Sequence, residues 1–78
     1  MADLTRTLAA AIAAAPCTLR ALARTAGLSP ALLSLIVSGK RHATPEVAEK
    51  IARALEAWSR DCDRLARKVR RAARTRRA

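Results

Sequence analysis

Apolar residues recur every three or four positions through residues 19–39, which is the spacing of residues on one face of an α-helix. Gly27 divides this segment, because the left-handed backbone that ends many helices costs glycine least. Ser29 and Pro30 then favour a new helix, since serine caps free amides and proline fits the first helical position. Gly39 predicts its end. The sequence therefore predicts two short helices joined by a tight turn, with buried faces made by Leu22, Ala23, Ala26, Leu32 or Leu33, and Ile36.

A further amphipathic helix is predicted at the start of the chain. Leu4, Leu8, Ile12 and Ala15 fall on one helical face, and the alanines between them are strong helix formers. Pro16 ends this helix, because proline interrupts helical hydrogen bonding. The alanine-rich stretch superficially resembles a short signal peptide, but its pattern fits better a helix that packs on the next two. We therefore expect a cytoplasmic protein, and no apolar run approaches the roughly 20 residues that span a membrane.

A last helix is predicted to start at Thr44, because threonine caps helices, Pro45 suits the first position and Glu46 suits the helix dipole. No stop signal follows. Ser59 offers a cap for a separate fifth helix, so a break there stays open, although the continuous apolar spacing favours one helix. Apolar residues alternate in steps of three and four over more than three heptads, at Ala48, Ile51, Leu55, Trp58, Cys62, Leu65, Val69 and Ala72.

The second half of this apolar heptad pattern has no other part of a single chain to cover it. Ile51 and Leu55 are expected to pack on the preceding helices, which leaves the later positions without a partner. Pairing with the same stripe of a second chain would bury them. Cys62 is therefore expected to be a small buried hydrophobe. The sequence predicts a homodimer with a seam formed by Trp58, Cys62, Leu65 and Val69.

The composition limits the chain to one small helical unit. With 78 residues and Trp58 as the single aromatic residue, the core must be aliphatic and rich in alanine, which suits close-packed helices and not a β-sheet. So small a core is only marginally sufficient, and association would stabilise it. We predict an all-α fold of four to five helices, with a main domain over residues 1–58 and a basic helical extension over residues 59–78.

The charge is strongly positive and unevenly spread. The chain carries 16 lysines and arginines against 6 acidic residues, a net charge of +10, which favours a polyanionic partner such as DNA, RNA or an acidic membrane. Residues 59–78 carry +7 of this charge, whereas residues 44–58 carry −1. Arginine outnumbers lysine thirteen to three. That ratio suits phosphate contacts, and a GC-rich genome explains it equally well.

Candidate catalytic and metal-binding residues are scarce. Cys17 and Cys62 are too few and too far apart for a zinc site or a disulfide framework, so free thiols are expected. His42 is the single histidine and has no neighbouring ligand set, so we expect no metal and no cofactor. We also expect no enzyme activity, because four acidic residues have a basic residue four positions on, which predicts surface ion pairs. The predicted pairs are Glu46–Lys50, Glu49–Arg53, Glu56–Arg60 and Asp63–Arg67.

Three stretches of the sequence resemble a known family. They are residues 22–29 (LARTAGLS), residues 34–41 (SLIVSGKR), and Thr44 and Pro45 leading into residues 51–55 (IARAL). Their order and spacing, within a match over roughly residues 4–58, are similar to the lambda-repressor-like regulators, also called Cro/C1-type or xenobiotic-response-element helix-turn-helix proteins. The resemblance implies a DNA-binding protein whose second motif helix, residues 30–38, enters the major groove.

The resemblance also implies which residues meet double-stranded DNA. The base-facing side chains are short, so they can touch thymine methyl groups or form single hydrogen bonds but not bidentate contacts. Affinity is then expected to depend on phosphates, and the basic tail would add attraction that weakens with salt. For Arg20, Arg24 and His42, plain solvent exposure is an equal alternative. The base-facing positions are Ser29, Ala31, Ser34 and Leu35, and the phosphate-facing positions are Thr18, Arg20, Arg24, Ser38, Lys40, Arg41 and His42.

Together these features favour a dimeric transcription regulator, a repressor that occupies a promoter with near-palindromic half-sites about one helical turn apart. We expect a phage, plasmid or bacterial origin, and no small-molecule ligand is evident. Two other classes stay open, namely a DNA-packaging protein of low specificity and an antitoxin or adaptor whose basic tail docks an acidic protein. A membrane role is weaker, because the tail has no bulky apolar residues beyond Leu65 and Val69.

Overall fold

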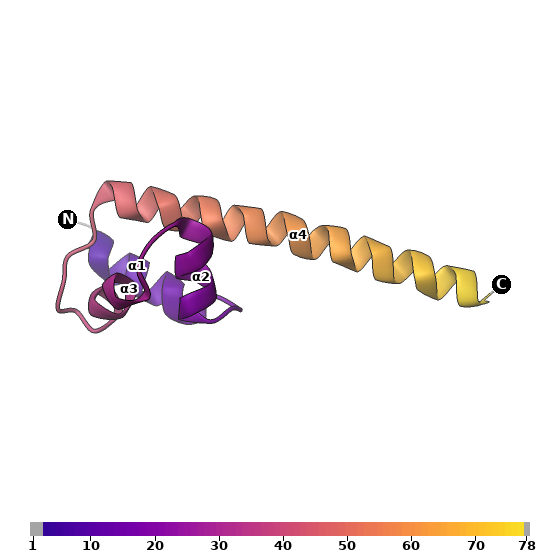
Figure 1. Cartoon of the computed structure of the whole chain (residues 1–78), viewed down its shortest axis with the longest axis horizontal. Coiled ribbons are helices and arrows are strands. Elements are labelled where there is room, and N and C mark those ends of the chain that lie inside the picture. Colours follow the sequence, from indigo (N-terminus) through magenta and orange to yellow (C-terminus); the bar gives the residue numbers. More distant parts are fainter. Residues whose placement is uncertain (1–2, 78) are drawn as a thin grey trace.

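The computed structural model describes residues 3–77, which form four α-helices and contain no β-strand. The helices are α1 (Leu4–Ala14), α2 (Leu19–Ala26), α3 (Pro30–Val37) and α4 (Pro45–Arg77). Figure 1 shows α1, α2 and α3 gathered beneath the first half of α4, while its second half projects beyond them. The predicted all-α fold is confirmed.

Each helix begins beside a side chain that accepts a hydrogen bond from the backbone amide three positions further on. The accepting oxygens belong to Asp3, Thr18, Ser29 and Thr44, at 3.2, 3.0, 3.0 and 3.2 Å from the amide nitrogens. These bonds satisfy amides that have no acceptor inside the helix. The helix starts predicted at Ser29 and Thr44 are confirmed.

Gly27 and Gly39 mark the ends of α2 and α3 in the left-handed backbone conformation, with φ of +72° and +80°. Beyond Gly27, the Leu28 amide donates to the Ala23 carbonyl at 2.8 Å, and an equivalent bond closes α3. For a residue with a side chain this conformation costs about 1–2 kcal/mol. The two glycines therefore fix where the chain turns, as their places in the sequence predict.

The core lies where α1, α2 and α3 meet beneath α4. α1 and α2 each pack against both α3 and α4. On α3 the inner position belongs to Leu33 and not to Leu32, which is only half-buried. Ala23 is fully buried, and its small side chain lets α2 approach its neighbours closely. The buried residues are Leu8, Ile12, Leu22, Ala23, Leu33, Ile36, Ile51 and Ala54.

α4 runs unbroken from Pro45 to Arg77, so the favoured prediction of one helix is confirmed and no separate helix begins at Ser59. After Pro45 the segment contains no glycine or proline, and it is rich in alanine and arginine, which are strong helix formers. We call residues 3–58 the body and residues 59–77 the tail, which extends away from the body as a single helix (Figure 1).

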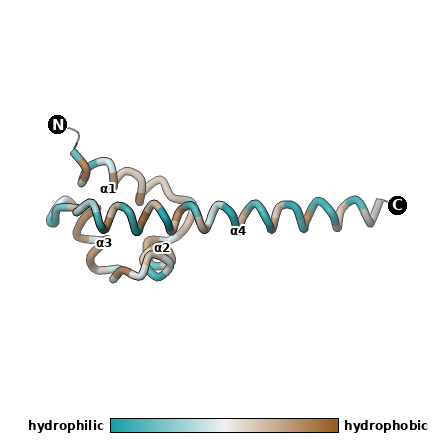
Figure 2. Tube along the Cα trace, turned by 90° about the horizontal axis from the view of Figure 1, so that it is seen from above, coloured by the Kyte–Doolittle hydropathy of each residue, from teal (hydrophilic) through white to brown (hydrophobic). Residues whose placement is uncertain are grey.

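The tail is mostly hydrophilic, with apolar residues returning at helical intervals (Figure 2). Leu65 and Val69 are 58% and 68% exposed. The prediction that Cys62 is buried is wrong for the single chain, because Cys62 lies near the start of the tail and is only half-buried. Long as α4 is, no helix within residues 3–77 is long and apolar enough to cross a membrane.

Two of the four ion pairs predicted on α4 are formed, with 3.0 and 2.7 Å between the charged atoms. The other two are not closed in the described part of the chain, and an unpredicted pair joins Asp61 to Arg64 at 3.7 Å. The prediction was partly wrong because exposed pairs gain little over their hydrated, separated ions. The pairs formed are Glu49–Arg53 and Asp63–Arg67, and the open ones are Glu46–Lys50 and Glu56–Arg60.

Candidate nucleic-acid interface

The outward face of α3 is the first part of the candidate interface. Ala31, Ser34 and Leu35 are three and four positions apart, so they share one side of the helix, and all three are exposed. Ser29 is exposed at the start of the same helix. The opposite side of α3 is anchored in the core. The four predicted base-facing residues are thus together at the surface.

The hydroxyl groups on this surface differ in what they can offer a ligand. Ser29 Oγ accepts the bond from the Leu32 amide, which leaves its hydroxyl proton available for donation. The Ser34 hydroxyl has no hydrogen-bond partner within the described residues, so it can donate and accept. Ser38 Oγ donates to the Leu35 carbonyl at 3.1 Å, and would have to break this bond to donate to a phosphate.

The loop after α3 carries an exposed basic cluster. The Leu35 carbonyl accepts hydrogen bonds from the Lys40 and Arg41 amides at 2.9 and 3.2 Å, which folds the loop back against the end of the helix. The side chains of Lys40, Arg41 and His42 are exposed. Because the backbone is held while the side chains reach into solvent, the cluster is presented beside the outward face of α3.

A hydrogen bond from α1 also holds this loop, and sequence reasoning missed it. Thr5 Oγ1 accepts from the Ala43 amide at 2.9 Å, and both residues are half-buried. The two are 38 positions apart, so no local pattern predicts the contact. The bond ties the loop that carries Lys40 and Arg41 to α1.

The start of α2 forms another part of the surface. Thr18 Oγ1 accepts from the Ala21 amide at 3.0 Å, whereas the Leu19 and Arg20 amides have no partner in the described part of the chain. Arg20 and Arg24 are exposed and four positions apart, so they share one side of α2. The positions after them, Ala21 and Thr25, border α4. On a helical projection, the two arginines therefore lie on the flank of α2 turned away from α4.

These elements match a known arrangement. The Cro/C1-type helix-turn-helix family model matches residues 17–57, more than half of the chain. The chain belongs to this family. Since its members are DNA-binding regulators and not enzymes, this Cro/C1-type protein is a DNA-binding regulator with double-stranded DNA as its partner. No curated protein and no solved structure matches the chain significantly.

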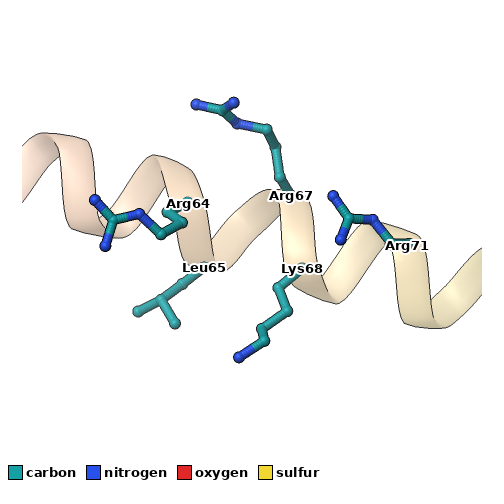
Figure 3. A pocket seen from close by; sticks show the side chains of 5 residues that line it. All are labelled: Arg64, Leu65, Arg67, Lys68 and Arg71. Carbon is teal, nitrogen blue, oxygen red and sulfur yellow. The ribbon is translucent and has the colours of Figure 1, made fainter.

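The family match ends at residue 57, so the tail of this Cro/C1-type protein lies outside it. Figure 3 shows five neighbouring tail residues, with Leu65 and Arg67 pointing to opposite sides of the helix. Three arginines and a lysine border a shallow hollow beside Leu65 on the surface of α4: Arg64, Arg67, Lys68 and Arg71. The tail therefore combines an apolar side with a strongly basic one.

Trp58 lies at the junction of the body and the tail. It is half-buried and borders a small cavity of about 20 Å³, which is also lined by residues of α2, of α4 and of the loop before α2. Of the four residues predicted for a dimer seam, Trp58 and Cys62 are thus partly covered by their own chain, while Leu65 and Val69 are not. The cavity is bordered by Cys17, Ala21, Leu22, Thr25, Ala54 and Trp58.

The titratable side chains of this Cro/C1-type protein form no metal site within residues 3–77, where no three of its histidine, cysteine and carboxylate groups come together. Cys17 and Cys62 are free thiols, each half-buried. His42 is exposed in the loop next to Lys40 and Arg41, and no ligand set surrounds it within residues 3–77. The chemistry available at this surface is therefore hydrogen bonding and charge.

Proposed function

We propose that the protein is a homodimeric transcriptional repressor that inserts α3 into the major groove of a near-palindromic site. The observation that carries the proposal is the exposed face of α3, with exposed positive charge on the loop that follows it and on the neighbouring helix α2. Lys40 and Arg41 follow α3, and Arg20 and Arg24 lie on the outer flank of α2. A helix that enters the major groove needs such cations to hold the phosphates on either side.

The side chains on α3 support weak readout of bases. Ala31 and Leu35 offer apolar contact to a thymine methyl group, and Ser29 and Ser34 each offer a single hydroxyl. None of them forms the bidentate contact that arginine makes with guanine. Much of the affinity then comes from phosphates, with contacts from Thr18, Arg20, Arg24, Ser38, Lys40, Arg41 and His42.

Dimerisation compensates for weak half-sites by doubling the contacts. The exposed Leu65 and Val69, together with the half-buried Trp58 and Cys62, supply an apolar stripe for a second copy of α4. Two copies related by twofold symmetry bind half-sites about one helical turn apart. Occupation of a promoter by this dimer would exclude the transcription machinery.

The test of specificity compares DNA from upstream of the protein's own gene with random DNA over a salt series. Specific regulators bind their sites about a thousandfold or more tighter than random sequence. If the affinity for upstream DNA exceeds that for random DNA by less than about tenfold at physiological salt, the repressor proposal is contradicted.

The test of the α3 surface uses two matched alanines. Ala31→Glu places a carboxylate on the exposed face of α3, near a helix start where an acid does not harm the fold. Ala10→Glu places the same charge on an exposed position of α1. We expect Ala31→Glu to weaken DNA binding at least about tenfold, equivalent to 1.4 kcal/mol, and Ala10→Glu to have a much smaller effect. Equal reductions in a fluorescence anisotropy titration would exclude α3 as the DNA surface.

A DNA-packaging role of low specificity is the second candidate, and the tail favours it. Residues 59–78 carry a net charge of +7, and such charge attracts DNA of any sequence. This role predicts nearly equal binding to upstream and random DNA, with an affinity that falls steeply as salt rises.

A further inference from the structure

The arginines of the tail are arranged in a regular stripe. Five of them follow one another in steps of four, three, four and three positions, so they lie on one side of α4. At 1.5 Å per residue the stripe is about 21 Å long. We call this set the arginine stripe, and it consists of Arg60, Arg64, Arg67, Arg71 and Arg74.

The arginine stripe lies opposite the apolar side of the same helix. Ile51 is 1% exposed and marks the side of α4 that faces the core. Val69 follows Ile51 after about five full helical turns and so continues that side. Arg60 follows Ile51 after about two and a half turns, which places the stripe on the side turned away from the body. Figure 3 agrees, with Leu65 and Arg67 pointing in opposite directions.

The outward face of α3 does not lie on the same side as the stripe. α3 packs against α1 and α2, and these two helices pack against the core-facing side of α4. Figure 1 shows α3 within the group of helices below α4. The helical projection from Ile51 places the stripe on the side of α4 that faces away from this group. A straight duplex held by α3 therefore leaves the arginine stripe of that chain uncovered.

The positive charge on this side of α4 begins where the tail begins. Over the body, the same side carries three acids and one base, all exposed: Glu46, Glu49, Arg53 and Glu56. From Arg60 onward its stripe positions are arginines. The charge along this side of α4 therefore changes from negative over the body to positive over the tail. The basic surface is confined to the tail and does not run along the whole helix.

Two aspartates partly neutralise the stripe in the free protein. Asp61 pairs with Arg64 at 3.7 Å, and Asp63 pairs with Arg67 at 2.7 Å. The side chains in both pairs are between 64% and 77% exposed, so the pairs are weak and a phosphate can replace the carboxylate. Guanidinium groups bind phosphate through two parallel hydrogen bonds, which makes that exchange favourable.

We propose that the arginine stripe binds the phosphate backbone of a second DNA segment, so that the protein bridges two duplexes. This inference rests on the proposed role of α3 in holding the first. DNA fits better than a membrane, because the opposite side of the tail offers only Leu65 and Val69 as large apolar residues. DNA is also the polyanion that this family binds, and arginines repeated along one side of a helix suit the repeated phosphates of a duplex backbone.

Capture of a second duplex tests the proposal. The full chain is bound to an immobilised duplex carrying upstream DNA, and a labelled random duplex is then added. The stripe variant R60Q/R64Q is compared with K68Q/R70Q, which removes the same charge from the flanks of the tail. We expect R60Q/R64Q to reduce capture at least fivefold, while the control variant captures nearly as well as the unchanged protein. Helical content is checked by circular dichroism.

The salt dependence of capture gives a second readout. Removing one arginine–phosphate interaction lowers the slope of log affinity against log salt by about 0.9, so R60Q/R64Q should lower it by about 1.8. Equal effects of the two variants would show a response to net charge alone and overturn the stripe. Unchanged capture by R60Q/R64Q would assign bridging to the two α3 surfaces of a dimer. That result would also overturn the proposed role of the arginine stripe.

Failure of this proposal is distinguishable from failure of the proposed function. Binding of the first duplex is measured separately, and it is weakened by Ala31→Glu and not by R60Q/R64Q if α3 holds that duplex. If the first duplex is bound specifically and no second duplex is captured, only the bridging proposal fails.

Discussion

The body half and the tail half of α4 carry the same apolar spacing but meet different surroundings. In the body, Ile51 is 1% exposed, because α1 and α2 pack beneath it. In the tail, Val69 lies on the same side of α4 as Ile51 but is 68% exposed. A heptad pattern thus specifies which side of a helix is apolar, but not what covers that side.

The two halves also differ in what keeps them helical. The body half is held by burial, which contributes roughly 25 cal/mol for each Å² of apolar surface removed from water. Apart from the half-buried Cys62, the side chains described in the tail, those of residues 59–74, are exposed. Helices of the tail's length are marginal in isolation. The tail depends on continuing a helix already formed by the body, on residues of high helix propensity, and on surface pairs such as Asp63–Arg67. The tail is therefore the half whose stability a partner can change.

The largest expected contrast between the halves comes from two leucines. Leu33→Ala removes a side chain that is 0% exposed, and large-to-small changes of this kind cost about 2–5 kcal/mol. Leu65→Ala removes one that is 58% exposed, so the body should lose less than about 0.5 kcal/mol. Denaturant unfolding followed by fluorescence of Trp58, the single tryptophan, measures both changes at the edge of the body.

Leu65→Ala should act on association instead. The substitution removes two leucine side chains from the proposed seam, one from each chain. Because each lost side chain costs about 1 kcal/mol or more of burial energy, the dimer dissociation constant should rise at least about tenfold. Sedimentation over a concentration series measures this. A dimer as tight as that of the unchanged protein would remove Leu65 from the interface, and a large loss of body stability would mean that the tail packs on the body.

Much of the body was predictable because its signals are local. Gly27 and Gly39 mark helix ends, Ser29 and Thr44 mark helix starts, and all four act through hydrogen bonds within a few residues. The exposed side of α3 follows from the same periodicity. Packing decided what local signals left open, such as the choice of Leu33 over Leu32 for the core.

Other features depended on distance in space or on where the body ends. The bond between Thr5 and Ala43 joins residues far apart in the sequence, so no periodicity predicts it. Cys62 is half-buried because the covering helices stop nearby, which the heptad pattern does not encode. The arginine stripe is present in the sequence as a spacing, but its meaning depends on the side of α4 that faces the body, and only the fold establishes that.

Thr5→Val should produce a smaller effect, confined to the loop after α3. Valine has nearly the shape of threonine but no acceptor for the Ala43 amide, and loss of such a bond costs about 1 kcal/mol. We expect faster hydrogen exchange at the Ala43 amide and DNA binding weakened by up to about fivefold, since about 1 kcal/mol corresponds to that factor. Thr7→Val, on the same helix and without such a bond, is the control. Unchanged exchange at Ala43 would show that the loop is held by other contacts.

The smallest expected effect compares two carboxylates on α4, one in each half. Asp63→Asn and Glu49→Gln each open one exposed ion pair and raise the net charge by one. Asp63 is within one turn of Arg60, Arg64 and Arg67, whereas Glu49 is eleven residues before Arg60, about 17 Å along the helix. Since charges are screened over about 8 Å at physiological salt, only Asp63→Asn should strengthen second-duplex capture, by about 1.5- to 3-fold. Equal gains from both substitutions would mean that the tail attracts DNA through total charge, and the distinction between the two halves of α4 would then be one of burial alone.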